Sequence, residues 1–334
     1  MAKPAQVKLG VMSFAHMHGA SYASAAKSLP GVELLGVADE DAARGAEMAE
    51  RFGTRLFESF DALCGSDVDG VIIVSDNKSH LPLAALAARH GKHILCEKPL
   101  ARTLPEACRI IQAAGKAGVI LGTAFPCRYI PAMRRVKEML ETGEMGPIRA
   151  IRGTNHGTMP GGWFTDKDRA GGGAVIDHTV HVADLMRWFL QSEVREVYAE
   201  VGTRFHKLDV DDCGMISMEF ENGCIATLDT SWSRPARSFP TWGDVTMKFV
   251  LDNGTVEIDS FNQKLDFYSE AAGKGKWVYF GDDIDLGLVR NFAAAIRGEE
   301  PISATGEDGL RALEVAVAAY ESSAAGRPVR LPIA

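Results

Sequence analysis

The first 124 residues alternate between short apolar runs and segments rich in alanine and charge, and this rhythm constrains the fold most. The apolar runs that predict buried strands are 7–12, 32–38, 71–74, 93–96 and 119–121. Strands that are apolar on both faces are typical of a parallel sheet covered by helices on both sides. Right-handed crossovers between them give a doubly wound α/β domain, which we place at residues 1–124.

Beyond Gly122 the pattern changes to longer strand-like segments, several of which alternate apolar and polar residues. The segments that predict strands are 147–155, 194–204, 213–220, 223–231, 244–251, 254–259, 264–268 and 276–280. Helices are expected near 131–142, 174–190, 284–297 and 307–324. Residues 125–334 therefore predict an α+β domain with a large open mixed or antiparallel sheet. Because an exposed sheet face attracts a partner, we expect a homodimer or homotetramer through this C-terminal sheet.

Charge and composition exclude several classes of function. The net charge is −8 and no run of Lys or Arg occurs, which argues against a nucleic-acid partner. No apolar run reaches the roughly 18 residues of a membrane span. The N-terminus lacks the apolar core of a signal peptide, and the six cysteines have no paired spacing. We therefore expect a cytoplasmic protein with free thiols, a small-molecule substrate and no membrane partner.

The turn after the first predicted strand departs from the glycine pattern of dinucleotide-binding chains. Such chains place G-x-G-x-x-G there, because glycine lets the backbone bend tightly and approach a pyrophosphate. Ser13, Ala15 and His18 stand at the three glycine positions. Ser13 and Ala15 are small, and the N–H groups of the helix N-terminus remain, so we expect a dinucleotide still to bind.

An acidic pair marks the end of the second predicted strand. Asp39 lies about 20 residues beyond the turn, where a carboxylate accepts hydrogen bonds from the adenosine ribose hydroxyls. Glu40 follows, with no Arg or Ser beside the pair, and a second carboxylate would repel a 2′-phosphate. The pattern favours NAD over NADP. The alternative role of Asp39 is to cap the following helix.

Two further segments carry groups suited to proton transfer. Lys98, within E-K-P, follows a predicted strand, and the carboxyl ends of parallel strands are where ligands bind. In GGGAVIDHTVHVAD, residues 171–184, three glycines give a flexible approach to a helix on which Asp177 and His181 share one face. A carboxylate and an imidazole so placed can act as orienter and base. A surface lysine and a solvated helix face are the alternatives.

Tryptophans and arginines of the second half are typical of a surface for a sugar, which has polar groups and an apolar face. They are Trp163, Trp232 and Trp242, with Arg128, Arg169 and Arg234. Alternatively, the tryptophans fill the interface between sheet and helices. Arg234 and Arg237 flank a proline-containing loop and suit the carboxylate of a sugar acid.

With these motifs the chain resembles the glucose-fructose oxidoreductase / inositol dehydrogenase family (Gfo/Idh/MocA) nearly from end to end. The resemblance rests on Asp39, VDGVIIVSDNKSH at 68–80, GKHILCEKPLA at 91–101, GGGAVIDHTVHVADLMRWFL at 171–190 and the C-terminal GLRALEVAVAAYESSAAGRPVRL. E-K-P and GGG-x3-D-x3-H in this order form a specific combination. The resemblance implies a Rossmann domain, an α+β domain and NAD-dependent hydride transfer at a secondary alcohol or ketone of a sugar, sugar acid or cyclitol.

The resemblance also implies roles for single residues. Lys98, Asp177 and His181 match the catalytic positions: His181 takes the proton, Lys98 hydrogen-bonds the reacting hydroxyl, and Asp177 holds His181 and binds a substrate hydroxyl. The expected substrate-binding residues are Arg128, Trp163, Asp177, His178 and His181. The expected cofactor-binding residues are Ser13, Phe14, Ala15, His16, Met17, Asp39, Ser75, Asn77, His80, Glu97 and Lys98.

Departures from the family pattern keep alternatives open. Besides the altered turn, Ser75-Asp76-Asn77 replaces a commoner Gly or Thr before Pro-Asn, and His178-Thr179 replaces an apolar-Gly pair. We expect no metal. The alternative is a metal-dependent or non-redox sugar-modifying protein in which His16, His18, His80, His178 and His181 gather around a zinc-like ion, with Asp177 as a further ligand. Another alternative is a sensor that binds dinucleotide or sugar without turnover.

Overall fold

The structure, a computed structural model, describes residues 6–333, which form two compact units that we treat separately. The first unit comprises the chain up to Pro126 together with Asp283–Leu310, and the second comprises Cys127–Asp282 and Arg311–Ala334. Asp283–Leu310 was expected in the second domain, whereas in the structure this segment belongs to the first unit. The reason is the helix α9 (Ile284–Arg297), whose buried Leu288, Val289 and Phe292 pack beside α1 and the first sheet.

The first unit is built on a parallel six-stranded sheet in the order β3-β2-β1-β4-β5-β6. Its strands are β1 (Val7–Met12), β2 (Val32–Ala38), β3 (Arg55–Leu56), β4 (Gly70–Ile73), β5 (His93–Glu97) and β6 (Leu121–Ala124). All their pairings are parallel, and the central strands are apolar on both faces. This confirms the doubly wound Rossmann sheet. The strand order reverses between β1 and β4, which is where such sheets bind ligands.

The helices of the first unit begin and end where the sequence supplies caps. They are α1 (Gly19–Ser28), α2 (Ala42–Phe52), α3 (Phe60–Cys64), α4 (His80–Arg89), α5 (Leu104–Ala117) and α9. The Thr103 hydroxyl accepts from the Glu106 N–H at the start of α5, and Gly118 ends that helix in the left-handed region. Ser79 does not cap α4. Instead the Asp76 carboxylate accepts from the Ser79 N–H and starts the 3-10 turn η1 (Asn77–Ser79).

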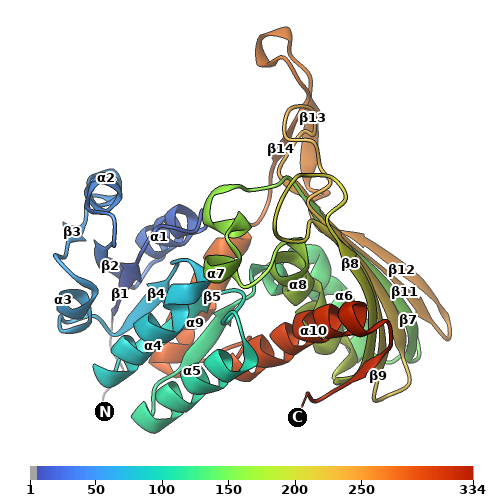
Figure 1. Cartoon of the computed structure of the whole chain (residues 1–334). Helices are drawn as coiled ribbons and strands as arrows, with labels where there is room; N and C mark the ends of the chain where they lie inside the picture. Colours follow the sequence, from blue (N-terminus) through green and yellow to red (C-terminus); the bar gives the residue numbers. More distant parts are fainter. Residues whose placement is uncertain (1–5, 334) are drawn as a thin grey trace. The chain divides into compact units, whose positions relative to one another are not determined.

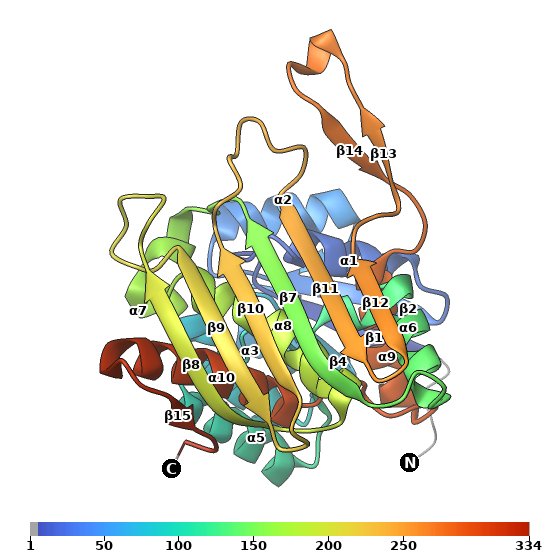
Figure 2. The same ribbon diagram turned by 90° about the vertical axis from the view of Figure 1, so that its right-hand side faces the viewer.

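The second unit is built on a mixed, mostly antiparallel sheet in the order β12-β11-β7-β10-β9-β8-β15, which Figure 2 shows face on. Its strands are β7 (Ile148–Gly157), β8 (Val194–Gly202), β9 (Cys213–Phe220), β10 (Ile225–Ser231), β11 (Gly243–Leu251), β12 (Gly254–Asp259) and β15 (Val329–Arg330). Only the pair β7–β10 is parallel among the described strands of this sheet. The expected open mixed sheet is thereby confirmed.

Helix α8 (Ala174–Leu190) covers one face of this sheet, against β7, β9 and β10. The other helical segments are α6 (Pro131–Glu141), α7 (Lys167–Ala170), η2 (Pro126–Tyr129), η3 (Gly162–Thr165), η4 (Glu270–Ala272) and α10 (Gly306–Ala325), which begins in the first unit. The face opposite α8 carries exposed Tyr198, Met215, Ile225 and Val250. The hairpin of β13 (Lys264–Phe267) and β14 (Lys276–Tyr279) projects beyond the sheet (Figure 1).

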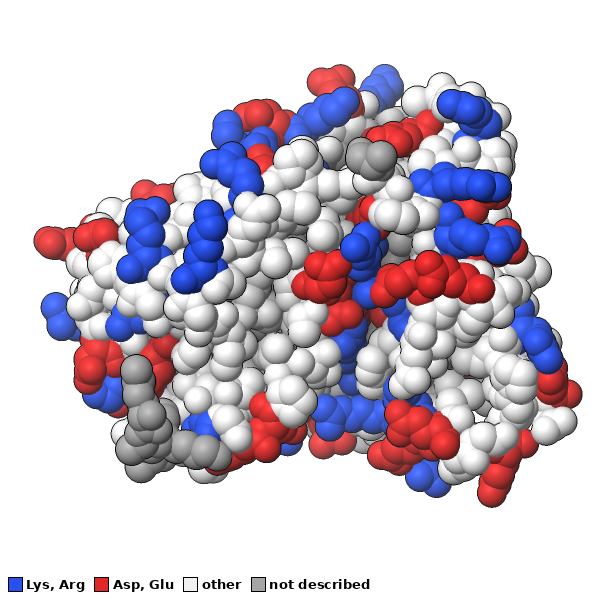
Figure 3. All heavy atoms as spheres, turned by 90° about the horizontal axis from the view of Figure 1, so that it is seen from below, with Lys and Arg blue, Asp and Glu red and all other residues white. Residues whose placement is uncertain are grey.

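Two surface properties bear on possible partners. Among the residues that the structure describes, no helix is both long and apolar enough to cross a membrane. Figure 3 shows basic and acidic side chains interspersed over the face that it presents.

Candidate active site

The turn after β1 adopts a left-handed backbone conformation at Ser13, where the dinucleotide-binding pattern has glycine. Ser13 has a φ of 73°, in the left-handed region where glycine is usual, and its N–H donates to the Ala38 carbonyl at 2.8 Å. Its hydroxyl accepts from the Ala15 N–H at 3.1 Å. The His16 N–H donates to the Val74 carbonyl at 3.0 Å. The turn is therefore held between β2 and β4, across the point where the strand order reverses.

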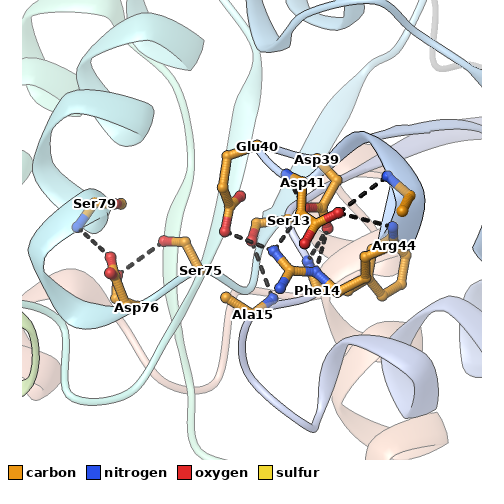
Figure 4. A network of polar contacts seen from close by, with 11 residues as sticks. Ser13, Phe14, Ala15, Asp39, Glu40, Asp41, Arg44, Ser75, Asp76 and Ser79 are labelled. Carbon is orange, nitrogen blue, oxygen red and sulfur yellow. Dashed lines mark hydrogen bonds and ion pairs between the residues drawn. The ribbon is translucent and has the colours of Figure 1, made fainter. Parts of the chain in front are cut away.

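The Asp39 carboxylate is the hub of the polar network drawn in Figure 4. It accepts from the Phe14 N–H at 2.8 Å and from the Arg44 guanidinium at 2.9 Å (Nε) and 2.6 Å (Nη2). Its side chain is fully buried beneath that guanidinium, which also bonds the Glu40 carboxylate at 2.7 Å. Arg44 was not expected at this site from the sequence. The signal that could have indicated it is its place in the first turn of α2, close to the end of β2. The N-cap of α2 is Asp41, so Asp39 does not cap this helix.

Ser75 and Asn77, two of the expected cofactor-binding residues, are buried just after β4. The Ser75 hydroxyl donates to the Asp76 carbonyl at 2.9 Å (Figure 4). Since β4 neighbours β1 in the sheet, Ser13 and Ser75 lie at the carboxyl ends of adjacent strands. Met17, also expected at the cofactor, has a largely exposed side chain.

A buried acid at the end of β5 lies against the histidines of the turn. Glu97 is fully buried, and its Oε2 lies 3.3 Å from Nδ1 of His18, which is also 3.2 Å from the Tyr22 hydroxyl. Burial raises the pKa of Glu97, but the neighbouring His16, His18 and Lys98 outweigh burial and hold that pKa well below its usual range. Burial lowers the His18 pKa, yet the Glu97 charge and hydrogen bond leave it raised.

At His80 and Asp285, in contrast, burial decides the direction in which the pKa is shifted. Nδ1 of His80 lies 3.0 Å from the Pro99 carbonyl, and burial lowers the His80 pKa. Burial raises the pKa of Asp285, on α9, to about 6, although the charge of His18 opposes this shift.

In the second unit, the glycines before α8 allow close approach of other groups. A Cβ on Gly173 would lie 1.9 Å from the Asp211 carbonyl oxygen, and one on Gly172 would lie 2.3 Å from the Tyr320 hydroxyl. The Asp211 carboxylate accepts from the N–H groups of Gly173 (2.9 Å) and Val175 (2.7 Å) and from the Tyr320 hydroxyl (2.8 Å). The expectation that these glycines serve as a flexible approach is wrong, because Asp211 caps the helix through them.

The first turns of α8 bring Asp177 together with His178. Asp177 Oδ2 accepts from the Trp232 indole N–H at 3.3 Å and lies 3.3 Å from Nε2 of His178. The other nitrogen of His178 is 3.1 Å from the Asn155 carbonyl, and the Asn155 amide donates to the His178 carbonyl at 3.1 Å. A carbonyl and a carboxylate can only accept hydrogen bonds. Both contacts of His178 are therefore hydrogen bonds only when both of its ring nitrogens carry a proton, or when one ring nitrogen and Asp177 each carry one.

His181 lies one turn further along α8 and is buried. Its Nδ1 is 3.9 Å from the Cys127 sulfur. The neighbouring Arg128, buried in η2, makes a two-pronged contact with the buried Asp184 at 2.7 and 2.6 Å. That ion pair joins η2 to α8. Arg128 as a substrate-binding residue stays a prediction.

The expected sugar-binding aromatics have different surroundings. Trp163 stacks on Phe164 with ring centroids 4.0 Å apart and packs in a buried cluster with Trp232, whereas Trp242 is exposed. The substrate role of Trp163 stays a prediction. Arg234 donates to Asp244 at 2.7 Å and contacts His156 Nδ1 at 3.1 Å.

Comparison with known proteins identifies the family to which this chain belongs. Residues 9–125 match the model of an oxidoreductase family with an NAD-binding Rossmann fold, and residues 133–257 match the GFO/IDH/MocA C-terminal domain. The chain is 30% identical to 1,5-anhydro-D-fructose reductase from Ensifer adhaerens, over 90% of this chain and 92% of that protein. It belongs to the Gfo/Idh/MocA family.

Other relatives agree with this membership. Myo-inositol 2-dehydrogenase from Thermotoga maritima is 27% identical over 97% of this chain and 98% of that protein. The structure of GenD2 from gentamicin A biosynthesis, in complex with NAD, superposes with a TM-score of 0.89 at 28% identity, over 98% of this chain and 97% of that one. This Gfo/Idh/MocA chain is an oxidoreductase with an NAD(P)-binding Rossmann fold.

The residues of the first unit fit a dinucleotide. Ser13 adopts the backbone conformation that the turn requires, and the turn leads directly into α1, whose N-terminus carries no side-chain cap. Those N–H groups suit a pyrophosphate. The Asp39 carboxylate stands at the end of β2, where a ribose diol binds, and Arg44 is the group that a diol would displace. Lys98 belongs to this unit, whereas Asp177 and His181 belong to the second.

Proposed function

We propose that this protein transfers a hydride between NAD and a secondary alcohol or ketone of a sugar, sugar acid or cyclitol. One observation supports this proposal above the others. Helix α8 carries His178 and His181, both buried, and Asp177, which is half-buried and contacts His178. A carboxylate and two imidazoles are thereby gathered on the first turns of one helix. In an oxidoreductase of this family, proton transfer at a carbinol needs groups of these types.

The chain's own residues would handle the proton and the orientation of the substrate. In the direction of oxidation, the carbinol C–H and O–H bonds break and a C=O bond forms. When bound, the nicotinamide supplies the acceptor of the hydride. We assign His181 as the base that takes the hydroxyl proton, and Lys98 as the cation that hydrogen-bonds the reacting hydroxyl. From the resemblance to the family we assign Asp177 to bind a substrate hydroxyl and to hold His181. The contacts that Asp177 makes in the structure are with His178 and Trp232.

The choice of NAD over NADP is supported by the charges around the adenosine ribose position. Asp39 and Glu40 share one Arg44 guanidinium, so the three side chains carry a net negative charge. A 2′-phosphate would meet both carboxylates, whereas a ribose diol can donate to Asp39 while Arg44 stays with Glu40.

Turnover tests the function directly. Purified protein with NAD⁺ and, in turn, inositols, anhydro sugars, aldoses and sugar acids should form NADH with at least one class. His181→Asn should lower kcat by about 10²–10⁴-fold and leave the Kd for NADH nearly unchanged. His206→Asn is the matched control, since His206 pairs with Asp212 in a loop of the same unit. Equal turnover by wild type and His181→Asn would contradict the role of His181, and absence of turnover with every class would favour a sensor.

The open face of the second sheet supports a homo-oligomer. Exposed Tyr198, Met215, Ile225 and Val250 lie on strands β8, β9, β10 and β11 of that sheet. We propose that a second copy of the chain covers this face, as a dimer or tetramer. Light scattering on the eluting protein measures the mass, and a monomer at micromolar concentration would contradict the proposal.

A further inference from the structure

Three side chains of the first unit form a compact set of metal-ligand atoms. A ring nitrogen of His16, a ring nitrogen of His18 and a carboxylate oxygen of Glu97 all lie within 4.8 Å of one another. The two histidines come from the turn after β1, and Glu97 comes from the end of β5. The rings of His16 and His18 are 4.4 Å apart between centroids. A dinucleotide is bound at such a turn by backbone N–H groups, so its binding does not explain two imidazoles there.

A second observation at the same place indicates that a cation belongs there. The Glu97 side chain is fully buried, and within residues 6–333 its Oε1 has no hydrogen-bond partner. A buried carboxylate oxygen without a partner is costly, and a bound cation removes that cost. Asp285 adds a further negative charge within electrostatic range of His18.

Contrary to the expectation of no metal, we propose that His16, His18 and Glu97 bind a divalent transition-metal ion of the zinc type. Two imidazoles and one carboxylate are a donor set that Zn²⁺ favours, whereas Mg²⁺ and Ca²⁺ select oxygen ligands. Ligands at the usual zinc distances lie about 3.4 Å apart, so atoms that lie within 4.8 Å of one another would close by at most about 1.4 Å through side-chain rotation. The ion replaces the hydrogen bond from the His18 N–H to His16 Nδ1 or the contact of His18 with Glu97.

A bound ion would fix the turn in which Ser13, Ala15 and His18 replace the usual glycines, because it joins that turn to β5. The site lies within one unit and needs no substrate. Its existence therefore does not depend on the proposed function, and turnover with NAD⁺ gives no information about it.

The test uses the full-length chain without a histidine tag, stripped with EDTA and then freed of chelator. Calorimetry with Zn²⁺ should show about one ion per chain, and Co²⁺ should give the d–d absorption of a nitrogen- and oxygen-ligated ion. His18→Asn and Glu97→Gln should each weaken Zn²⁺ binding by more than the roughly 10–100-fold that loss of a supporting hydrogen bond costs. His90→Asn is the matched control, since His90 pairs with Asp61 on the surface of the same unit, and it should bind Zn²⁺ as the wild type does.

Two results would overturn the proposal. If the wild-type chain takes up no Zn²⁺ or Co²⁺, then the cluster is an ion pair between a protonated His18 and Glu97. If His18→Asn and Glu97→Gln bind Zn²⁺ as tightly as the wild type, then the ion is held elsewhere, for instance by cysteines. If either variant fails to fold, thermal unfolding provides a second test. The melting temperatures of the wild type and of His90→Asn should both rise when Zn²⁺ is added, and no rise in either would show that the ion does not bind the folded chain.

Discussion

The turn after β1 and the start of α8 use glycine in opposite ways. The turn is expected to contain glycine but has Ser13, which adopts a φ of 73° and offers its hydroxyl to the Ala15 N–H. The start of α8 has three glycines, and a Cβ on Gly173 would lie 1.9 Å from the Asp211 carbonyl oxygen. At the turn only a backbone angle is needed, and a small residue can supply it at modest cost. At α8 another backbone occupies the space, and no side chain fits.

The difference shows that the need for glycine at a position depends on which atoms approach that position. The left-handed conformation costs a non-glycine residue roughly 1–2 kcal/mol, which one hydrogen bond can largely offset. An overlap between backbone atoms cannot be offset in this way, because neither of the two backbone segments can move without losing its own hydrogen bonds. The altered turn is therefore compatible with a working dinucleotide site.

The largest effect is expected at Gly173. Gly173→Ala should destabilise the protein by about 3–5 kcal/mol, because the new methyl group pushes Asp211 away from the N–H groups that it caps. The melting temperature should fall by roughly 10 °C or more. Gly115→Ala is the control: an added Cβ there meets nothing within 4 Å, so helix α5 should gain about 0.5–1 kcal/mol. Similar melting temperatures for the two variants would break the comparison.

An intermediate effect is expected from pH at the strand that supports α8. Asn155 of β7 holds His178, and its neighbour His156 lies between Asp244 (2.9 Å) and Asp229 (3.2 Å). Burial lowers the His156 pKa, but the two carboxylates outweigh it and raise that pKa to about 9. Because the folded-state pKa exceeds the unfolded one, the added stability is full below pH 6.5 and is lost as the pH rises through about 9.

His156→Gln isolates this contribution. At pH 6 the wild type should have a larger free energy of unfolding than His156→Gln. This difference should shrink by up to about 3 kcal/mol when the pH is raised to 9.5. Chemical denaturation at a series of pH values measures this difference. A difference that stays constant over the range would mean that His156 is not held as a cation.

The smallest effect is expected at Ser13. Ser13→Ala keeps the left-handed φ but loses the hydrogen bond to the Ala15 N–H, so it should cost about 1 kcal/mol. Ser13→Gly loses the same bond but relieves the backbone, so its stability should lie closer to the wild type. Thermal unfolding of the three proteins orders them. A Ser13→Ala variant more stable than Ser13→Gly would show that the left-handed φ is not retained.

Much of the fold could be predicted from the sequence, because hydrophobic periodicity is a local property. The helix expected at 174–190 is present over Ala174–Leu190, and the strand expected at 254–259 is present as β12. In the structure the first unit reaches Pro126 before the chain enters the second unit. The assignment of Asp283–Leu310 could not be predicted, because it depends on which surface the buried face of α9 covers.

The site was less predictable, because it depends on contacts between residues distant in sequence. Glu97 meets His18 across 79 positions, and Asp211 caps α8 from 38 positions beyond Gly173. Arg44 covers Asp39 although no basic residue adjoins the acidic pair in the sequence. The residue types were visible, whereas their pairing was not. Lys98, Asp177 and His181 as the reacting groups stay predictions that rest on the family.

The central question is whether the turn after β1 still binds a dinucleotide and prefers NAD. Calorimetric titration of nucleotide-free protein with NADH and then with NADPH measures both. We predict a Kd for NADH on the order of micromolar and binding of NADPH weaker by at least about tenfold, or about 1.4 kcal/mol. Absence of binding by either nucleotide would contradict the account of the Ser13 turn, and tighter binding of NADPH would contradict the role given to Asp39, Glu40 and Arg44.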